Sequence, residues 1–224
     1  MFKNLLKKTA IALVMSFAAS SYAASNVAVV YYSKSGVNTK SLAESVKAFT
    51  GAELFRIETT EPYPEDYTAT TEVVKKEMDE GVLRPIKKLD IDLAKYDVLV
   101  IASPTWWHHI AGPVESWIRS VDLKDKFILT ATTHGGGGVM ETRKDFENLL
   151  KGSKLGTQLT VFGSVDRESV QVHDWLKENK VIYRIFDVIV NLIRSVPFLI
   201  LIIVLMPYTK KIVGQSYGTK ATLV

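Results

Sequence analysis

Apolar and polar positions follow two different periods along residues 26–180 of this chain. Short runs rich in β-branched residues predict strands, and the first run, 26–32, is apolar almost throughout, as in a strand buried on both faces. Between these runs, apolar residues three or four positions apart predict helices. The predicted strands are 26–32, 53–57, 96–102, 126–132 and 158–162. The predicted helices are 38–49, 68–80, 111–120, 140–151 and 168–179.

This alternation indicates an α/β fold, a three-layer sandwich in which helices cover both faces of a five-stranded parallel sheet. In such sheets, ligands bind beyond the carboxyl ends of the strands. The loops after the first, third and fourth predicted strands are therefore the places to look for a site.

The first 23 residues depart from this pattern and are typical of a secretory signal peptide. Three lysines precede a short apolar stretch, 11–19, and Ser21 and Ala23 place small residues where a signal peptidase cleaves. We expect cleavage after Ala23, with an uncleaved N-terminal anchor as the alternative. Either interpretation exports the rest of the chain, in a bacterium to the periplasmic side of the inner membrane.

Residues 181–224 differ as well, because they have helical periodicity and the part from 195 to 209 carries no charge. A helix of that length is roughly 22 Å long, against a hydrocarbon core of ~30 Å. The segment predicts attachment to a membrane, either as a short or tilted span or as a helix lying in the interface. The predicted organisation is a signal peptide (1–23), an α/β domain (24–180) and an apolar helical tail (181–224).

Charge and composition exclude several classes of function. The chain of 224 residues has no cysteine, which excludes disulfides, thiol catalysis and cysteine-ligated metals. Its net charge is +4, but segment 24–180 holds 20 Lys and Arg against 23 Asp and Glu, a net charge of −3. A mildly acidic domain argues against nucleic-acid binding, which needs a basic face.

The loop 33–39 follows the first predicted strand and opens the first helix. Hydroxyls, a glycine and an asparagine at a helix N-terminus can cradle an anion, because backbone N–H groups and the helix dipole both favour negative charge there. The alternative is an ordinary helix cap. The loop lacks the endings typical of nucleoside-triphosphate and dinucleotide loops.

The loop 103–109 contains two adjacent tryptophans, Trp106 and Trp107. They suggest a flat aromatic ligand stacked on an indole, with a pair that caps the core as the alternative. We interpret His108 and His109 as polar loop groups, because neighbouring side chains on an extended segment point in different directions and cannot easily share a metal.

The loop 133–138 contains four consecutive glycines after Thr133 and His134. Glycines allow a backbone to approach a ligand closely, and a flexible surface loop is the alternative. Taken together, an anion cradle, an aromatic platform and a glycine loop at one sheet edge suit flavin mononucleotide (FMN), which has a terminal phosphate and a planar ring.

Residues 26–180 resemble the flavodoxin family, in its short-chain form. The resemblance is carried by YYSKSGVNTK at 31–40, PYPEDY at 62–67, SPTWW at 103–107 and THGGG at 133–137. It implies non-covalent FMN and a sheet order of 2-1-3-4-5. It assigns no catalytic residue and no metal.

The resemblance also implies which residues contact the cofactor. The phosphate loop would be Ser33, Ser35, Gly36, Val37, Asn38 and Thr39; Val37 is an insertion relative to the family's usual Gly-Asn-Thr, so the phosphate contacts are expected to shift by a residue. The loop on one side of the ring would be Pro104, Thr105, Trp106, Trp107 and His108. The loop at the other edge of the ring would be Thr133, His134, Gly135, Gly136 and Gly137.

The tail has a resemblance of its own, to an internal stretch of a methionine-type ABC-importer permease, with motifs at 184–187, 194–201, 207–210 and 212–218. The leading hypothesis is an exported FMN protein that passes electrons to or from a redox partner protein or a small donor or acceptor. It would act as a carrier or as a reductase of the NAD(P)H or quinone type. The alternatives are a flavin-free membrane-associated module and the remnant of a permease fusion.

Overall fold

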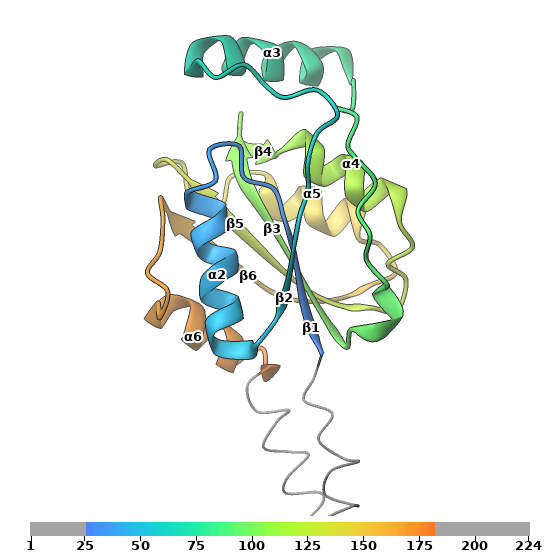
Figure 1. Cartoon of the computed structure of the whole chain (residues 1–224), viewed down its shortest axis with the longest axis vertical. Coiled ribbons are helices and arrows are strands. Elements are labelled where there is room, and N and C mark those ends of the chain that lie inside the picture. The colour runs from blue at the N-terminus through green and yellow to red at the C-terminus, as the bar shows by residue number, and fades with distance from the viewer. Residues whose placement is uncertain (1–25, 182–224) are drawn as a thin grey trace, which may run out of the picture. The chain divides into compact units, whose positions relative to one another are not determined.

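A parallel sheet runs through residues 26–181, the part of the chain that the computed structural model describes (Figure 1). Its strands are β1 (Val27–Tyr31), β2 (Glu53–Arg56), β3 (Val98–Trp106), β4 (His109–Ile110), β5 (Phe127–His134) and β6 (Lys154–Phe162). The helices are α2 (Asn38–Thr50), α3 (Tyr67–Glu80), the 3₁₀ turn η1 (Leu93–Lys95), α4 (Gly112–Ser120), α5 (Thr142–Leu149) and α6 (Val170–Glu178).

The predicted signal peptide and the predicted membrane tail lie outside the described residues, apart from residue 181. Among the helices of residues 26–181, none is both long and apolar enough to cross a membrane.

The prediction of five strands in the order 2-1-3-4-5 is corrected by the structure. The sheet has six strands, in the order β2-β1-β3-β5-β6, and β4 lies off this path and pairs antiparallel with β3. The extra strand arises at Trp107 and His108, whose φ angles of 46° and 76° are both positive. Positive φ at both central residues makes a two-residue turn that folds the chain back on itself, so a segment that we expected to be a loop becomes a hairpin.

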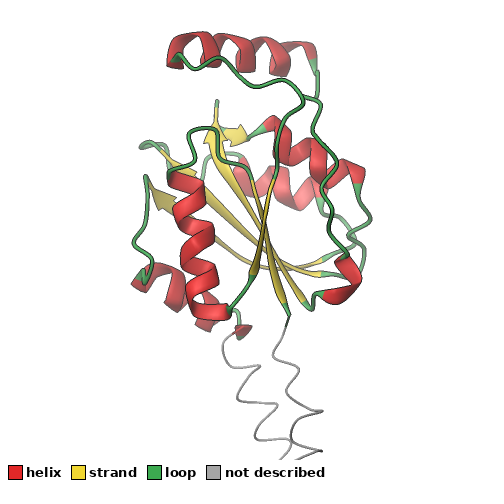
Figure 2. Cartoon of the chain, viewed as in Figure 1, coloured by secondary structure: helices red, strands yellow, loops and turns green. Residues whose placement is uncertain are grey.

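Two helical layers cover the sheet and create two cores (Figure 2). On one face, Leu42 and Val46 of α2 and Leu176 of α6 pack against β1 and β3. On the other face, Trp117 of α4 and Phe146 of α5 pack against the same strands, and all of these side chains are buried. The strands are apolar on both faces because both faces are covered, as the sequence predicts.

The helix α3 does not lie against a face of the sheet but above its carboxyl edge, in the long connection between β2 and β3 (Figure 1). Its first turn is capped by Asp66, whose carboxylate accepts a hydrogen bond from the Ala69 N–H at 2.8 Å. Gly81 ends it in the left-handed conformation. Only Thr70 and Val74 of this helix are buried, so it is amphipathic with a narrow apolar side.

The last strand begins four residues earlier than the sequence pattern suggests. The register between β5 and β6 shifts between Ile128 and Thr130, and Gly156 lies at this irregularity. A Cβ on Gly156 would be 2.3 Å from a methyl carbon of Leu129 and 2.4 Å from Asn179 Oδ1, so a larger residue would require these side chains to move. Because polar residues and a glycine occupy the start of this strand, the sequence shows no apolar periodicity there.

Candidate functional site

The predicted cofactor loops meet because their strands are neighbours. Strand β3 pairs in parallel with β1 on one side and with β5 on the other, so the three carboxyl ends lie at one edge of the sheet. The closest link between two of the loops is a hydrogen bond between the hydroxyls of Thr39 and Thr133, at 2.9 Å. Both side chains are buried, so the start of α2 is fixed directly to the end of β5.

The loop before α2 presents an uncapped helix N-terminus. Val37 occupies the N-cap position and makes no side-chain hydrogen bond to the first turn. Serine, threonine, aspartate or asparagine usually fills this position and accepts from a first-turn N–H. The N–H groups at the start of α2 therefore have no side-chain acceptor among the described residues, which is the arrangement that binds an anion.

Two cations tie this loop to neighbouring segments, one from outside the loop and one from within it. The Arg56 guanidinium donates to the carbonyl oxygen of Ser33 at 2.9 Å, and Lys34 Nζ donates to the carbonyl oxygen of Glu65 at 3.0 Å. Together with Lys87, these residues border a cavity of about 550 Å³ beside the loop. We did not predict Arg56 as part of the site. The sequence feature that could have indicated Arg56 is its position as the last residue of a strand that ends at the same edge of the sheet.

The two tryptophans take different roles. The Trp106 ring packs edge-on against Tyr32, at 5.5 Å between centroids, and against Tyr63, at 5.1 Å. The Trp107 indole is 48% exposed, and its Nε1 donates to the carbonyl oxygen of Thr71 on α3 at 3.1 Å. Trp106 thus belongs to an aromatic cluster with both tyrosines, whereas Trp107 is half exposed beside α3, with Lys75 Nζ 5.8 Å from the centre of its ring.

Burial in the aromatic cluster raises the pKa values of its two tyrosines. Burial raises the pKa of Tyr32 to about 12, with Arg56 and Arg84 partly opposing the shift. Burial also raises the pKa of Tyr63, and the hydrogen bond from its hydroxyl to the Glu77 carboxylate adds to the rise. Both phenols stay neutral at physiological pH and contribute no negative charge to the edge where the phosphate is expected.

The glycine loop is organised by its own histidine. His134 Nδ1 accepts hydrogen bonds from the N–H groups of Gly136, at 3.0 Å, and Gly138, at 3.1 Å. Gly136 has φ of 138°, a conformation that side chains with a Cβ rarely adopt, and nothing lies within 4 Å of where its Cβ would be. The space beside Gly136 is therefore open. His134 stabilises the conformation of the loop through its two hydrogen bonds.

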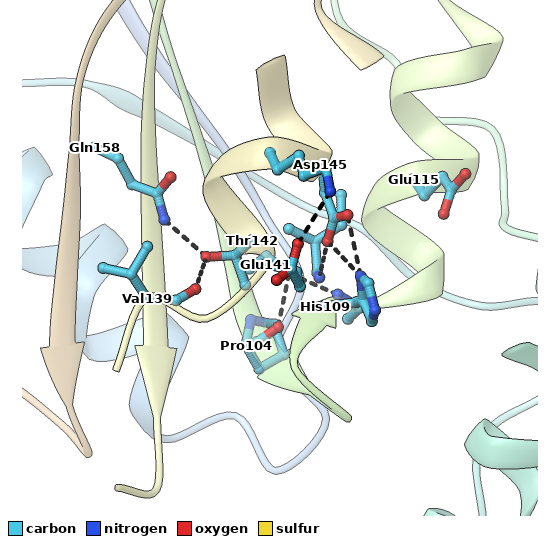
Figure 3. Close-up of polar contacts among 12 residues, drawn as sticks. Pro104, His109, Glu115, Val139, Glu141, Thr142, Asp145 and Gln158 are labelled. Atoms are coloured by element: carbon cyan, nitrogen blue, oxygen red, sulfur yellow. Dashed lines mark hydrogen bonds and ion pairs between the residues drawn. The ribbon is translucent and has the colours of Figure 1, made fainter. Parts of the chain in front are cut away.

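The segment that follows the third loop contacts the second loop. The Glu141 N–H donates to the carbonyl oxygen of His108 at 3.1 Å. Figure 3 shows that Thr142, which follows, accepts from the Gln158 amide at 2.9 Å and donates to the carbonyl oxygen of Val139 at 2.6 Å. The loop 139–142 is thus fixed between the hairpin and β6.

One buried polar atom at this edge has no partner. The hydroxyl of Thr105, in the ring-side segment, makes no hydrogen bond within residues 26–181. Buried hydroxyls are normally satisfied, so such an atom indicates a missing ligand or water. The unpaired hydroxyl, the uncapped helix and the open glycine loop together fit a planar ligand that carries a phosphate.

The fold has clear relatives among solved structures. A protein from Bacteroides eggerthii superposes with a TM-score of 0.60 at 22% identity, covering 68% of this chain and 96% of that one. A flavoprotein from Lactobacillus acidophilus, solved in complex with FMN, gives 0.56 at 22% identity, covering 68% of this chain and 99% of the other. The NMR structure of its apo form gives 0.51 at 21% identity over 68% and 97% of the two chains. At these identities the likeness shows the fold.

A second, short similarity concerns methionine importers. The D-methionine transport system permease protein MetI of Salmonella typhi is 43% identical over 49 residues, which are 22% of this chain and 23% of the permease. The MetI of Escherichia coli K12 is 46% identical over 46 residues, 20% of this chain and 21% of the permease. This chain thus spans about a fifth of the permeases that it matches, in agreement with the permease-like fragment that the sequence motifs predict.

The family model described as flavodoxin matches residues 26–179, which is nearly the whole described part of the chain and well over half of its length. The match includes all three loops at the carboxyl edge of the sheet. The chain therefore belongs to the flavodoxin family.

Proposed function

We propose that the domain binds FMN without a covalent bond and uses it in electron transfer or oxidoreduction. Membership of the flavodoxin family supports this proposal, as does the FMN complex of the Lactobacillus acidophilus flavoprotein with the same fold. The observation that carries it is that the uncapped N-terminus of α2, the ring-side segment with Trp107 and the open glycine loop follow neighbouring strands at one edge of the sheet.

Each loop would hold a different part of the cofactor. The N–H groups at the start of α2 and the hydroxyls of Ser35 and Thr39 would bind the phosphate, where the helix dipole favours negative charge. Trp107 would face the ring, and Thr105 would supply a hydroxyl to its edge. The flavin, when bound, supplies the electron-accepting chemistry, while the protein orients it and tunes it through hydrogen bonds and nearby charge.

The experiment is a titration of the purified full chain with FMN and, in parallel, with riboflavin. We expect a shift of the visible flavin absorbance, quenching of flavin and tryptophan fluorescence, and much tighter binding of FMN than of riboflavin. A protein that stays colourless with added FMN would contradict the proposal and favour the flavin-free module. Equal affinity for the two flavins would contradict the phosphate assignment alone.

The electron donor and acceptor define two versions of the function. A reductase would oxidise NADH, NADPH or a hydroquinone with the purified FMN-loaded chain alone. A carrier would bind FMN yet show no turnover until a redox partner protein is added. Steady-state assays with and without a partner therefore separate the two.

Export to the periplasmic side of the inner membrane is also part of the proposal. It rests on the lysines and small residues of segment 1–23 and on the uncharged stretch 195–209. Cell fractionation with an epitope tag at Val224 tests it. Recovery of the full chain from the cytoplasm would contradict export, and recovery from the soluble periplasm would contradict membrane attachment.

A further inference from the structure

A second cavity, of about 460 Å³, lies between α3, β4 and the helices α4 and α5. None of the predicted cofactor residues lines it. Its volume is in the range of small-molecule sites, which combine an apolar wall with a few polar groups that point inward.

One wall is apolar and exposed. Met78, Val82 and Leu83 come from the end of α3 and the turn after it, and all three line the cavity. Their exposed fractions are 40%, 51% and 40%, which is high for side chains of this kind. Ile110 and Leu149 continue the apolar surface on the other side. Covering this wall with an apolar group would be favourable, because it removes apolar surface from water.

The polar wall contains a histidine held in one orientation by a carboxylate. His109 Nδ1 lies 3.1 and 3.0 Å from the two carboxylate oxygens of Asp145, and the Ile110 N–H donates to the same carboxylate at 3.1 Å (Figure 3). A carboxylate only accepts hydrogen bonds, so Nδ1 carries the hydrogen that bonds Asp145. In the imidazole tautomer with its single hydrogen on Nδ1, Nε2 is an acceptor. Within residues 26–181, Nε2 makes no hydrogen bond.

The charged groups of the cavity are already paired. Arg119 contacts the Glu115 carboxylate through Nε, at 2.8 Å, and through a terminal nitrogen, at 2.7 Å. Glu77 lies 2.9 Å from Arg84 Nε as an ion pair whose angle does not make a hydrogen bond. Asp145 accepts hydrogen bonds from His109 Nδ1 and the Ile110 N–H, so the described wall offers no free cation to an anionic ligand.

We propose that this cavity binds an uncharged small molecule with an apolar body and a hydroxyl group, a phenol or similar alcohol, whose O–H donates to His109 Nε2. The apolar body would cover Met78, Val82 and Leu83. A carboxylate ligand would be excluded, because it would face Asp145 and Glu115 without a free cation. Tyr63 borders both this cavity and the one beside the phosphate loop, but none of the residues proposed to contact FMN lines this cavity, and the proposal does not depend on FMN.

The test uses three related compounds on the full chain labelled at histidine, with imidazole resonances followed by NMR. The compounds are 4-methylphenol, toluene, which lacks the oxygen, and 4-methylbenzoate, which carries a charge. We expect 4-methylphenol to shift the His109 resonances saturably. Toluene should bind about tenfold more weakly, the loss of roughly one hydrogen bond. We expect 4-methylbenzoate to bind at least as weakly as toluene.

Variants separate the two walls. His109→Gln should weaken 4-methylphenol about tenfold and leave toluene unchanged, whereas Val82→Asp on the exposed apolar wall should weaken both. His173, which also contacts an aspartate but on α6, provides the matched control: His173→Gln should change neither affinity. Equal shifts at His109 and His173, no saturation, or equal affinity for toluene and 4-methylphenol would overturn the proposal. FMN titrations of the same variants report on the cofactor site independently.

Discussion

The hydroxyl oxygens of Thr39 and Thr133 lie 2.9 Å apart in the interior, one at the start of α2 and the other near the end of β5. This bond joins the loop expected to hold a phosphate to the loop expected to lie beside a ring. Neither hydroxyl is left unsatisfied, so the bond fixes the distance between the two loops before any ligand is present.

Breaking this pair should destabilise the fold. Thr39→Val leaves the Thr133 hydroxyl buried without a partner, which should lower the free energy of unfolding by about 1–3 kcal/mol. Replacing both threonines with valine should cost clearly less than the sum of the two single changes. Urea unfolding of the four proteins measures this coupling, and Thr68→Val on the exposed side of α3 is the control. Strict additivity would show that the two hydroxyls do not interact.

The phosphate assignment predicts a change confined to one flavin. Ser35 is exposed, so Ser35→Ala should leave the stability of the fold unchanged. It should remove a donor to a charged group and weaken FMN by about 1.5–3 kcal/mol while leaving riboflavin unaffected. Parallel fluorescence titrations with both flavins check this. A similar loss for both flavins would move Ser35 away from the phosphate.

The two tryptophans should give opposite phenotypes. Trp107→Ala removes an exposed indole and should weaken FMN by about 1–3 kcal/mol, the usual value of stacking on an aromatic side chain. Trp106→Ala should mainly lower the free energy of unfolding, because Trp106 packs against Tyr32 and Tyr63. Denaturant unfolding and FMN titration of both variants separate these effects. A loss of flavin affinity in Trp106→Ala alone would reverse the assignment.

The buried phenol of Tyr32 should make the fold less stable at high pH. Its pKa is raised from 10.0 to about 12, so the unfolded chain loses this proton first as the pH increases. The stabilisation is complete below pH ~10 and is lost as the pH rises through the folded pKa, at up to ~1.4 kcal/mol per pH unit. Urea unfolding at several alkaline pH values should show a shallower decline for Tyr32→Phe. An unchanged slope would mean that Tyr32 does not contribute.

Two glycines of the third loop form a matched pair for mutation. Gly136 has φ of 138°, whereas Gly135 has no such restriction, and neither position has an atom within 4 Å of an added Cβ. Gly136→Ala should therefore destabilise the loop by about 1 kcal/mol or more, and Gly135→Ala should be tolerated. Thermal unfolding and FMN affinity of the two variants provide the comparison. Equal effects would show that the positive φ of Gly136 does not set the cost of an added side chain in this loop.

The layers of the fold and the position of the site are predictable from sequence because buried parallel strands leave a strong signal. The apolar run at 26–32 and the turn-rich segments after three strands place the loops at one edge. The hairpin at Trp107 and His108 could not be predicted, because its positive φ angles fall on residues that do not favour them. The start of β6 could not be predicted for a different reason. A glycine, Gly156, stands where Leu129 packs closely, and a glycine interrupts the apolar pattern of a strand.

The site residues, too, are predictable from sequence only in part. Residue type and loop position predict Thr39 and Trp107 as candidates, but not what they contact. The bond from Thr39 to Thr133 spans 94 residues, and the indole of Trp107 reaches α3 across 36 residues. The first pairing depends on the order of the strands in the sheet, and the second on the path of the β2–β3 connection over the carboxyl edge. Nothing in the local sequence indicates either.

The pairing of β1 with β3 has a consequence for the order in which the chain can fold. Val27 is in register with Val98, so β1 has no partner on that side until the β2–β3 connection has been made. Contacts so distant in sequence form slowly, and an apolar strand with an open edge can pair with another molecule in the meantime. A nascent or truncated chain that ends before Val98 should therefore depend on chaperones to stay unaggregated.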